Sequence, residues 1–145
     1  MKITIETPRE GEEDEIIIRC ANLDEKTMQL IYSLKSEQDV LMGYQEEKIM
    51  RIASKDVDYF ESVDNKVFAY TRHGVYEIHK KLYELEQEYG SSDFLRISKS
   101  TIVNLSKIAY VKPIFNGRFE AKLKNEEKLI ISRQYVLDLK KKLGI

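Results

Sequence analysis

Residues 94–106 read Phe-Leu-Arg-Ile-Ser-Lys-Ser-Thr-Ile-Val-Asn-Leu-Ser, and this stretch decides the fold. Its first apolar residues predict a strand from Phe94 to Ile97, and the polar residues around Lys99 predict a loop after it. Further along, Asn104 stands between apolar residues, and we expect its side chain to hold a turn by a hydrogen bond to the backbone. The stretch therefore predicts a strand that leads into a basic loop.

The residues after this stretch predict a short β meander and a final helix. Asn116-Gly117 is the dipeptide typical of a type I′ hairpin turn. Ser132 is a suitable N-cap for a helix that Gly144 ends. The strands expected here span residues 108–114, 118–122 and 128–131.

The residues before it predict further strands and two helices. An amphipathic helix is expected over 82–89, with Gly90 after it at a position that favours positive φ. Asn22 with Glu25 predicts a capped helix that runs to about Ser36. The strands expected in this part span residues 2–6, 16–21, 40–44, 49–53, 57–62, 67–70 and 75–78. The front of the chain is thus a small ββαβ module, residues 1–43.

Composition predicts a folded chain of ordinary domain size. The sequence has 145 residues, 42% of them hydrophobic, and only 6 Gly and 2 Pro, so a substantial core is expected. Cys20 is the only cysteine and lies in an apolar run, which predicts a buried thiol. No apolar run reaches the length of about 18 residues that a membrane span needs, and the start does not resemble a signal peptide. We expect a cytoplasmic protein.

Charge is divided unevenly along the chain. Residues 91–145 carry 12 basic and 5 acidic side chains, whereas residues 1–90 carry 12 basic and 20 acidic ones. The formal net charge of −1 hides this division. Such asymmetry suggests that the basic part presents a face to a polyanion.

The blocks at 56–62, 82–85, 94–108 and 132–136, in this order, resemble the LytTR DNA-binding domain of bacterial transcriptional regulators. The resemblance covers residues 44–145. It implies a mostly β fold with short helices, in which ten strands form three sheets. It also implies loops that enter successive major grooves of double-stranded DNA, at sites arranged as direct repeats.

The resemblance assigns base contacts to Lys99 and to Arg133, at the start of the last helix. Both side chains suit this role, because Arg and Lys donate to O6 and N7 of guanine. A weaker contact is implied for the loop of Asp64, Asn65 and Lys66. Phosphate contacts, which give affinity rather than sequence choice, are expected from Arg96, Ser98, Ser100, Lys107, Arg118, Lys122, Ser132, Lys140, Lys141 and Lys142.

Two departures from the family pattern affect what we expect. The family usually has His before its basic reader, whereas this chain has Ser98 before Lys99, so its sequence preference should differ. The front module is too short for the receiver domain that often precedes this domain. Short members of the family resemble this chain, and some are restrained by a membrane protein. We expect residues 1–43 to serve regulation or homodimerisation, with the acidic stretch 10–15 solvated.

Two other classes of function remain open from the sequence. The acidic front could make this a protein–protein interaction module, and the aromatic residues Tyr59, Phe60, Phe68 and Tyr70 could stack on single-stranded RNA, although a β core is the simpler interpretation. Catalysis has little support, because neither His73 nor His79 stands at metal-ligand spacing and no Gly-rich phosphate loop is present. We expect no enzyme activity, no metal and no cofactor.

Overall fold

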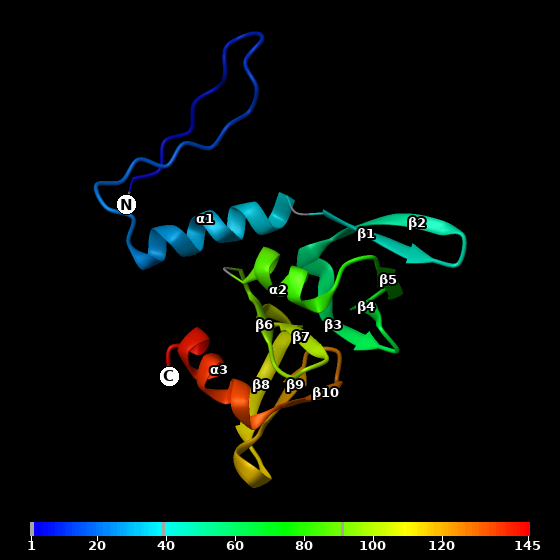
Figure 1. The fold of residues 1–145 in the computed structure, drawn as a ribbon. Coiled ribbons are helices and arrows are strands. Elements are labelled where there is room, and N and C mark those ends of the chain that lie inside the picture. The colour runs from blue at the N-terminus through cyan, green and yellow to red at the C-terminus, as the bar shows by residue number, and fades with distance from the viewer. Residues whose placement is uncertain (1, 39, 91) are drawn as a thin grey trace.

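The computed structural model describes residues 2–38, 40–90 and 92–145, which form a mostly β domain with short helices (Figure 1). The helices are α1 (Glu25–Gln38), α2 (Leu82–Tyr89) and α3 (Val136–Leu143). The strands are β1 (Val40–Gln45), β2 (Lys48–Ala53), β3 (Val57–Val63), β4 (Lys66–Thr71), β5 (Gly74–Ile78), β6 (Phe94–Arg96), β7 (Thr101–Asn104), β8 (Ile108–Pro113), β9 (Phe119–Leu123) and β10 (Lys128–Ile131). Short 3-10 turns lie at Ser54–Asp56, Leu105–Lys107, Phe115–Gly117 and Arg133–Tyr135.

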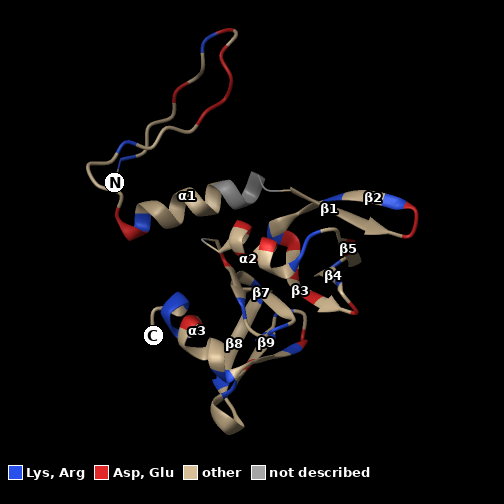
Figure 2. Ribbon diagram, in the orientation of Figure 1, with Lys and Arg blue, Asp and Glu red and all other residues tan. Residues whose placement is uncertain are grey.

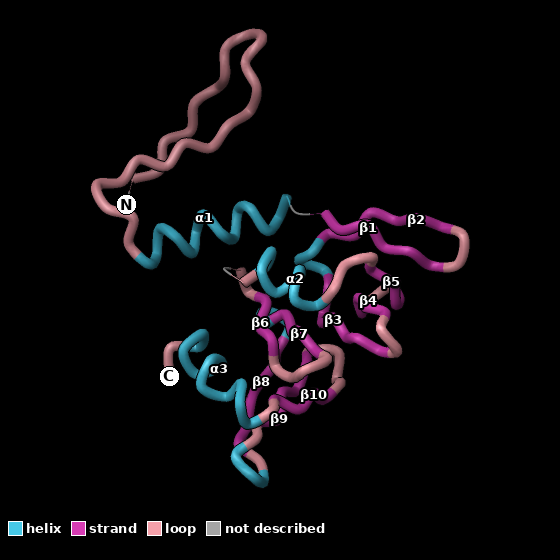
Figure 3. The backbone as a smooth tube through the Cα atoms, viewed as in Figure 1, coloured by secondary structure: helices cyan, strands magenta, loops and turns pink. Residues whose placement is uncertain are grey.

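The ten strands form two sheets in the described part of the chain, rather than the three that the resemblance implied. Seven strands follow the order β2-β1-β5-β4-β3-β7-β6, and three follow the order β10-β9-β8. All the pairs are antiparallel. Figure 3 distinguishes the strands, in magenta, from the helices and the loops. The β1–β2 hairpin joins the larger sheet through a single pair, Tyr44 with Glu77, which is why the number of sheets falls by one.

Two apolar clusters hold the domain together. In the first, α2 packs on the larger sheet, where Phe60, Tyr89 and Phe94 lie with ring centroids 5.3–6.4 Å apart. In the second, Ile97 and Val103 pack with residues of the smaller sheet and with Leu139 of α3. The second cluster holds the end of β6 against the last helix, and the candidate functional site lies there.

Asn104 makes the structural hydrogen bonds that the sequence predicted. It is 1% exposed; its Nδ2 donates to the carbonyl of Val57 at 2.9 Å, and its Oδ1 accepts from the Ser106 amide at 3.1 Å. It lies at the end of β7, a strand that the sequence reading missed because the polar residues around Lys99 interrupt the apolar pattern.

The front of the chain departs most from the prediction. Residues 2–6 and 16–21 form no strands, and Ile3 and Ile5 are 83% and 93% exposed. This segment, residues 2–24, forms a long loop that reaches away from the domain (Figure 1). The alternating pattern is suited to strands, but a lone two-stranded hairpin is marginal in water without a further surface to cover it. Cys20, predicted to be buried, is exposed for the same reason.

The division after residue 43 stays a prediction; in the structure, residues 40–45 form β1, whose Leu41 is buried in the first cluster. Two finer predictions are corrected. The residue that caps α1 is Asp24 rather than Asn22: the Asp24 carboxylate accepts from the Thr27 amide at 2.8 Å. Gly90 has φ −62° and not the positive φ that was expected. Glycine is favoured there because the backbone passes close to the Glu86 carbonyl oxygen, from which a Cβ would lie only 2.7 Å.

Candidate nucleic-acid interface

The loop that carries Lys99 connects β6 to β7 and is closed at its base. The Ile97 amide donates to the Thr101 carbonyl at 3.0 Å, and Ile97 itself is fully buried. At the tip, the Ser100 amide donates to the Ser98 hydroxyl at 3.2 Å. Lys99 is exposed. The fold therefore presents Lys99 on a short loop with a fixed base.

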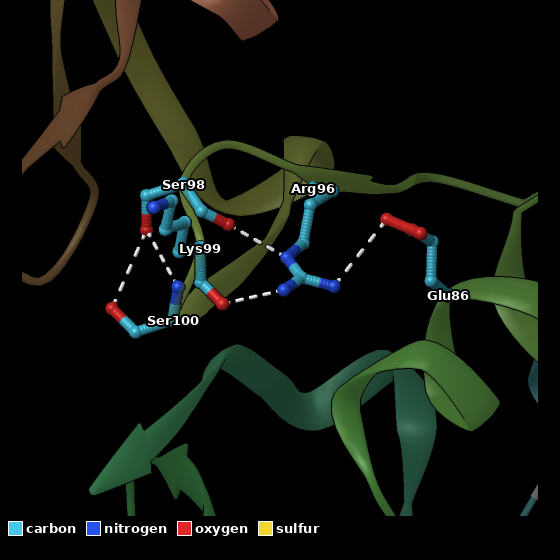
Figure 4. A network of polar contacts seen from close by, with 5 residues as sticks. All are labelled: Glu86, Arg96, Ser98, Lys99 and Ser100. Carbon is cyan, nitrogen blue, oxygen red and sulfur yellow. Dashed lines mark hydrogen bonds and ion pairs between the residues drawn. The ribbon is translucent and has the colours of Figure 1, made fainter.

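Arg96 lies under this loop and contacts its backbone (Figure 4). Its Nε donates to the Ser98 carbonyl at 2.6 Å, and its Nη2 donates to the Lys99 carbonyl. Its Nη1 lies 3.6 Å from the Glu86 carboxylate of α2. The sequence predicted a phosphate contact at Arg96; the structure places its guanidinium on three protein partners.

Arg133 is exposed at the first position of the 3-10 turn that follows β10. Its stem passes close to Gly117 in the β8–β9 turn, where a Cβ would come within 3.1 Å of the Arg133 Cδ. Asn116 and Gly117 both have positive φ, as a type I′ turn requires. Ser132 does not cap the helix as predicted: its side chain makes no capping bond, and α3 begins only at Val136.

Backbone hydrogen bonds join the predicted contact loops to one another. The Ser132 amide donates to the Ile97 carbonyl at 2.8 Å, and the Ser62 amide donates to the Ser100 carbonyl at 2.8 Å. Ser62 immediately precedes the β3–β4 turn, in which Asp64 and Asn65 have φ 51° and 64°. The loop of Lys99, the turn of Arg133 and the turn at 64–66 thus lie at one end of the domain, which we call the loop end.

Arg118 belongs to the loop end, whereas Lys107 and Lys122 do not. Arg118 precedes Phe119, which pairs with Ile131 beside Ser132. Lys107 and Lys122 lie at the other end of the smaller sheet. Along β9, Arg118 and Lys122 are separated by about 13 Å, at about 3.3 Å per residue. Lys122 is paired there with Glu126 at 3.0 Å.

The lysines of α3 make contacts within the protein. Lys142 donates from Nζ to the Gly90 carbonyl at 2.9 Å, and the Nζ of Lys140 lies 5.8 Å from the centre of the Phe119 ring. Lys141 is exposed. In Figure 2, the ribbon is blue at the basic residues near the end of this helix, and it is red along much of the loop of residues 2–24.

Asp58 gives a pH-dependent prediction for the far end of the domain. Burial raises the pKa of its carboxyl above 3.8, against the attraction of Lys107, and Asn125 donates to it at 3.3 Å. Because the pKa of Asp58 is higher in the native state than in the unfolded state, the unfolded state loses this proton at a lower pH. The free energy of unfolding therefore falls as pH rises from the unfolded pKa through the native pKa. Asp58→Asn is therefore expected to gain stability relative to the wild type between pH 4 and pH 7, as measured by chemical denaturation.

The Asp58 experiment has a matched control in Asp64→Asn, which makes the same chemical change in an exposed turn. A wild type that gains stability relative to Asp58→Asn as pH rises would contradict the prediction.

The other candidate chemistries find less support in the described residues. No group of three His, Cys, Asp or Glu side chains stands close enough to hold a metal ion there. His79 stacks on Tyr44 with ring centroids 3.7 Å apart. Tyr59 and Phe60 are buried, and Tyr59 stacks on Tyr70 at 4.3 Å, so these rings fill the protein rather than form an open platform. Within the same residues, no helix is both long and apolar enough to cross a membrane.

Comparison with known proteins places the chain in a family. The sequence profile of the LytTr DNA-binding domain matches residues 47–144. The chain therefore belongs to the LytTR DNA-binding domain family. A solved LytTr DNA-binding domain from Bacillus cereus has the same fold: it superposes with a TM-score of 0.70 at 24% identity, over 73% of this chain and 97% of that one.

Two kinds of relative differ in length. The sensory transduction protein LytT of Bacillus anthracis is 34% identical over 100 residues, which are 69% of this chain and 41% of that protein. This chain thus spans about two-fifths of that relative. An uncharacterized HTH-type transcriptional regulator of Staphylococcus aureus is 29% identical over 147 aligned residues, which cover 100% of this chain and 99% of that protein.

Proposed function

We propose that this protein regulates transcription by binding double-stranded DNA with its loop end. The observation that carries the proposal is the pair of backbone hydrogen bonds, Ser132 to Ile97 and Ser62 to Ser100, that joins three exposed loops at one end of the domain. Membership of the family and the basic character of residues 91–145 support the same function. Nothing comparable favours RNA binding through the aromatic rings, which are largely buried.

In this proposal, Arg133 and Lys99 contact base edges and the turn at 64–66 makes a weaker contact. Arg133 is the stronger reader, because its guanidinium presents two parallel donors to guanine O6 and N7. Lys66 and Arg118, which lie exposed at the loop end, contact phosphates, with Lys141 as a further candidate. Lys107 and Lys122 lie at the other end of the smaller sheet, so we do not include them in the phosphate contacts of the loop end.

A gel-shift experiment with the full chain tests the proposal. The probe is the DNA upstream of the gene, with random DNA and RNA of the same sequence as competitors. A specific complex that random DNA and RNA displace poorly supports the proposal. Equal displacement by RNA, or no complex at low salt, would refute it and favour a protein-interaction role.

The exposed front segment suggests a second property, which is self-association. Ile3, Ile5 and residues 16–18 present isoleucines to solvent at exposures between 36% and 93%. Two strands cannot bury these side chains, but the segments of two copies together could supply four strands with an apolar face. We propose that the front segments of two copies pair, so that a homodimer engages two direct repeats.

Removal of residues 1–23 is expected to abolish this dimer. The remaining chain keeps Asp24, which caps α1, and the whole of β1, so the fold should survive. In sedimentation at tens of micromolar, the full chain should be dimeric and the shortened chain monomeric. A full-length control in which Ile16, Ile17 and Ile18 are replaced by Ser should also be monomeric. Equal dimerisation of all three proteins would show that the segment has another role.

A further inference from the structure

We propose that Arg96 is a positioning residue that fixes the direction of Lys99 and that Glu86 of α2 holds Arg96 in place. This inference rests on the proposed function and deepens it. It replaces the phosphate contact that the sequence predicted at Arg96 with an indirect role in sequence choice.

The contacts of Arg96 fix the tip of the loop from below. Two successive carbonyls, those of Ser98 and Lys99, turn toward the guanidinium and accept from its Nε and Nη2 (Figure 4). Successive carbonyls held on one planar cation leave the peptide between them little freedom to rotate. The Lys99 side chain stays exposed on this fixed peptide.

The surroundings of Arg96 make a phosphate contact unfavourable. Its side chain is only 18% exposed, and the Glu86 carboxylate lies 3.6 Å from its Nη1. A phosphate would have to displace these partners and would meet the negative charge of Glu86. The ion pair with Glu86 also offsets the positive charge of Arg96 itself, which lowers its attraction for a phosphate.

Glu86 belongs to an element that is itself firmly held. Leu82, Leu85 and Tyr89 bury one face of α2 in the first apolar cluster. The carbonyl of Gly90, just after α2, accepts from Lys142 of the last helix. One short helix thus braces the loop of Lys99 through Glu86 and the helix that follows Arg133 through Gly90. This arrangement links the two elements that carry the proposed base contacts.

The test compares Arg96→Gln, Lys99→Ala and the wild type by selection from a random DNA library. Lys99→Ala defines the base positions that Lys99 reads. At those positions, Arg96→Gln is expected to lose preference by about tenfold, comparable to loss of a base contact, while the positions read by Arg133 keep theirs. The slope of log K against log salt should stay unchanged. If Arg96 contacted a phosphate instead, Arg96→Gln would make the slope smaller by about 0.9 and would leave the base preference unchanged.

Glu86→Gln on the exposed face of α2 decides the question if Arg96→Gln fails to fold. We expect a partial loss of preference at the same base positions. The matched control is Glu88→Gln on the same helix, whose partner is Lys80 at 2.7 Å and which should keep full preference. If both Arg96→Gln and Glu86→Gln keep the wild-type preference, the inference is overturned. A wild type with no preference would instead refute the proposed function.

Discussion

Binding to DNA is expected to weaken by about two orders of magnitude when salt rises from about 50 mM to about 200 mM, because each neutralised phosphate contributes a slope of about −0.9. The exposed cations of the loop end are Lys66, Lys99, Arg118 and Arg133. If all four displace counterions, the slope is about −3.6, and a fourfold rise in salt lowers the affinity about 150-fold. A titration followed by fluorescence anisotropy measures this slope directly.

Two single variants show whether the slope comes from the loop end. Arg118→Gln should make the slope smaller by about 0.9, since it removes one cation there. Lys122→Gln should leave it unchanged, because Lys122 lies at the other end of the smaller sheet and is paired with Glu126. A nearly flat salt dependence for the wild type would favour protein interaction over DNA binding. An equal effect of the two variants would place the DNA on a different face.

The sequence predicted those features that depend on a few neighbouring residues. Asn116-Gly117 adopts the positive φ angles of its turn, and Gly144 ends the last helix with φ 74°. The buried side chain of Asn104 bonds to the backbone as expected. In each case the residue type itself prefers the local geometry, so no distant part of the chain had to be known.

The predictions that were wrong depended on distant partners. Residues 2–6 alternate as a strand does and residues 16–21 begin with an apolar run, but both segments are exposed in the structure. β7, which pairs with β3 and β6, was missed because the polar residues around Lys99 interrupt the apolar pattern. The ion pair of Arg96 with Glu86 could not be predicted either, since Glu86 belongs to a different element. Within the candidate site, residue type and family pattern indicated the residues, but only the fold shows which of them lie together.

Arg133→Ala is expected to weaken binding to a specific site by about 1–3 kcal/mol, because a bidentate contact to guanine carries discrimination of that size. The fold should remain intact, since the side chain is exposed and only its stem approaches Gly117. Affinity for specific and random DNA, measured side by side, should show a larger loss for the specific site. Thermal unfolding provides the check on stability.

Comparison with Lys99→Ala makes this prediction sharper. The two side chains lie on different segments, which the hydrogen bond from Ser132 to Ile97 and the second apolar cluster join. They should therefore read different base pairs, and library selection with each variant should show losses of preference that do not overlap. Losses at the same base pairs would mean that both side chains approach one groove position. If Arg133→Ala bound its specific site as tightly as the wild type, Arg133 would not be a reader, and the orientation of the loop end on DNA would have to be different.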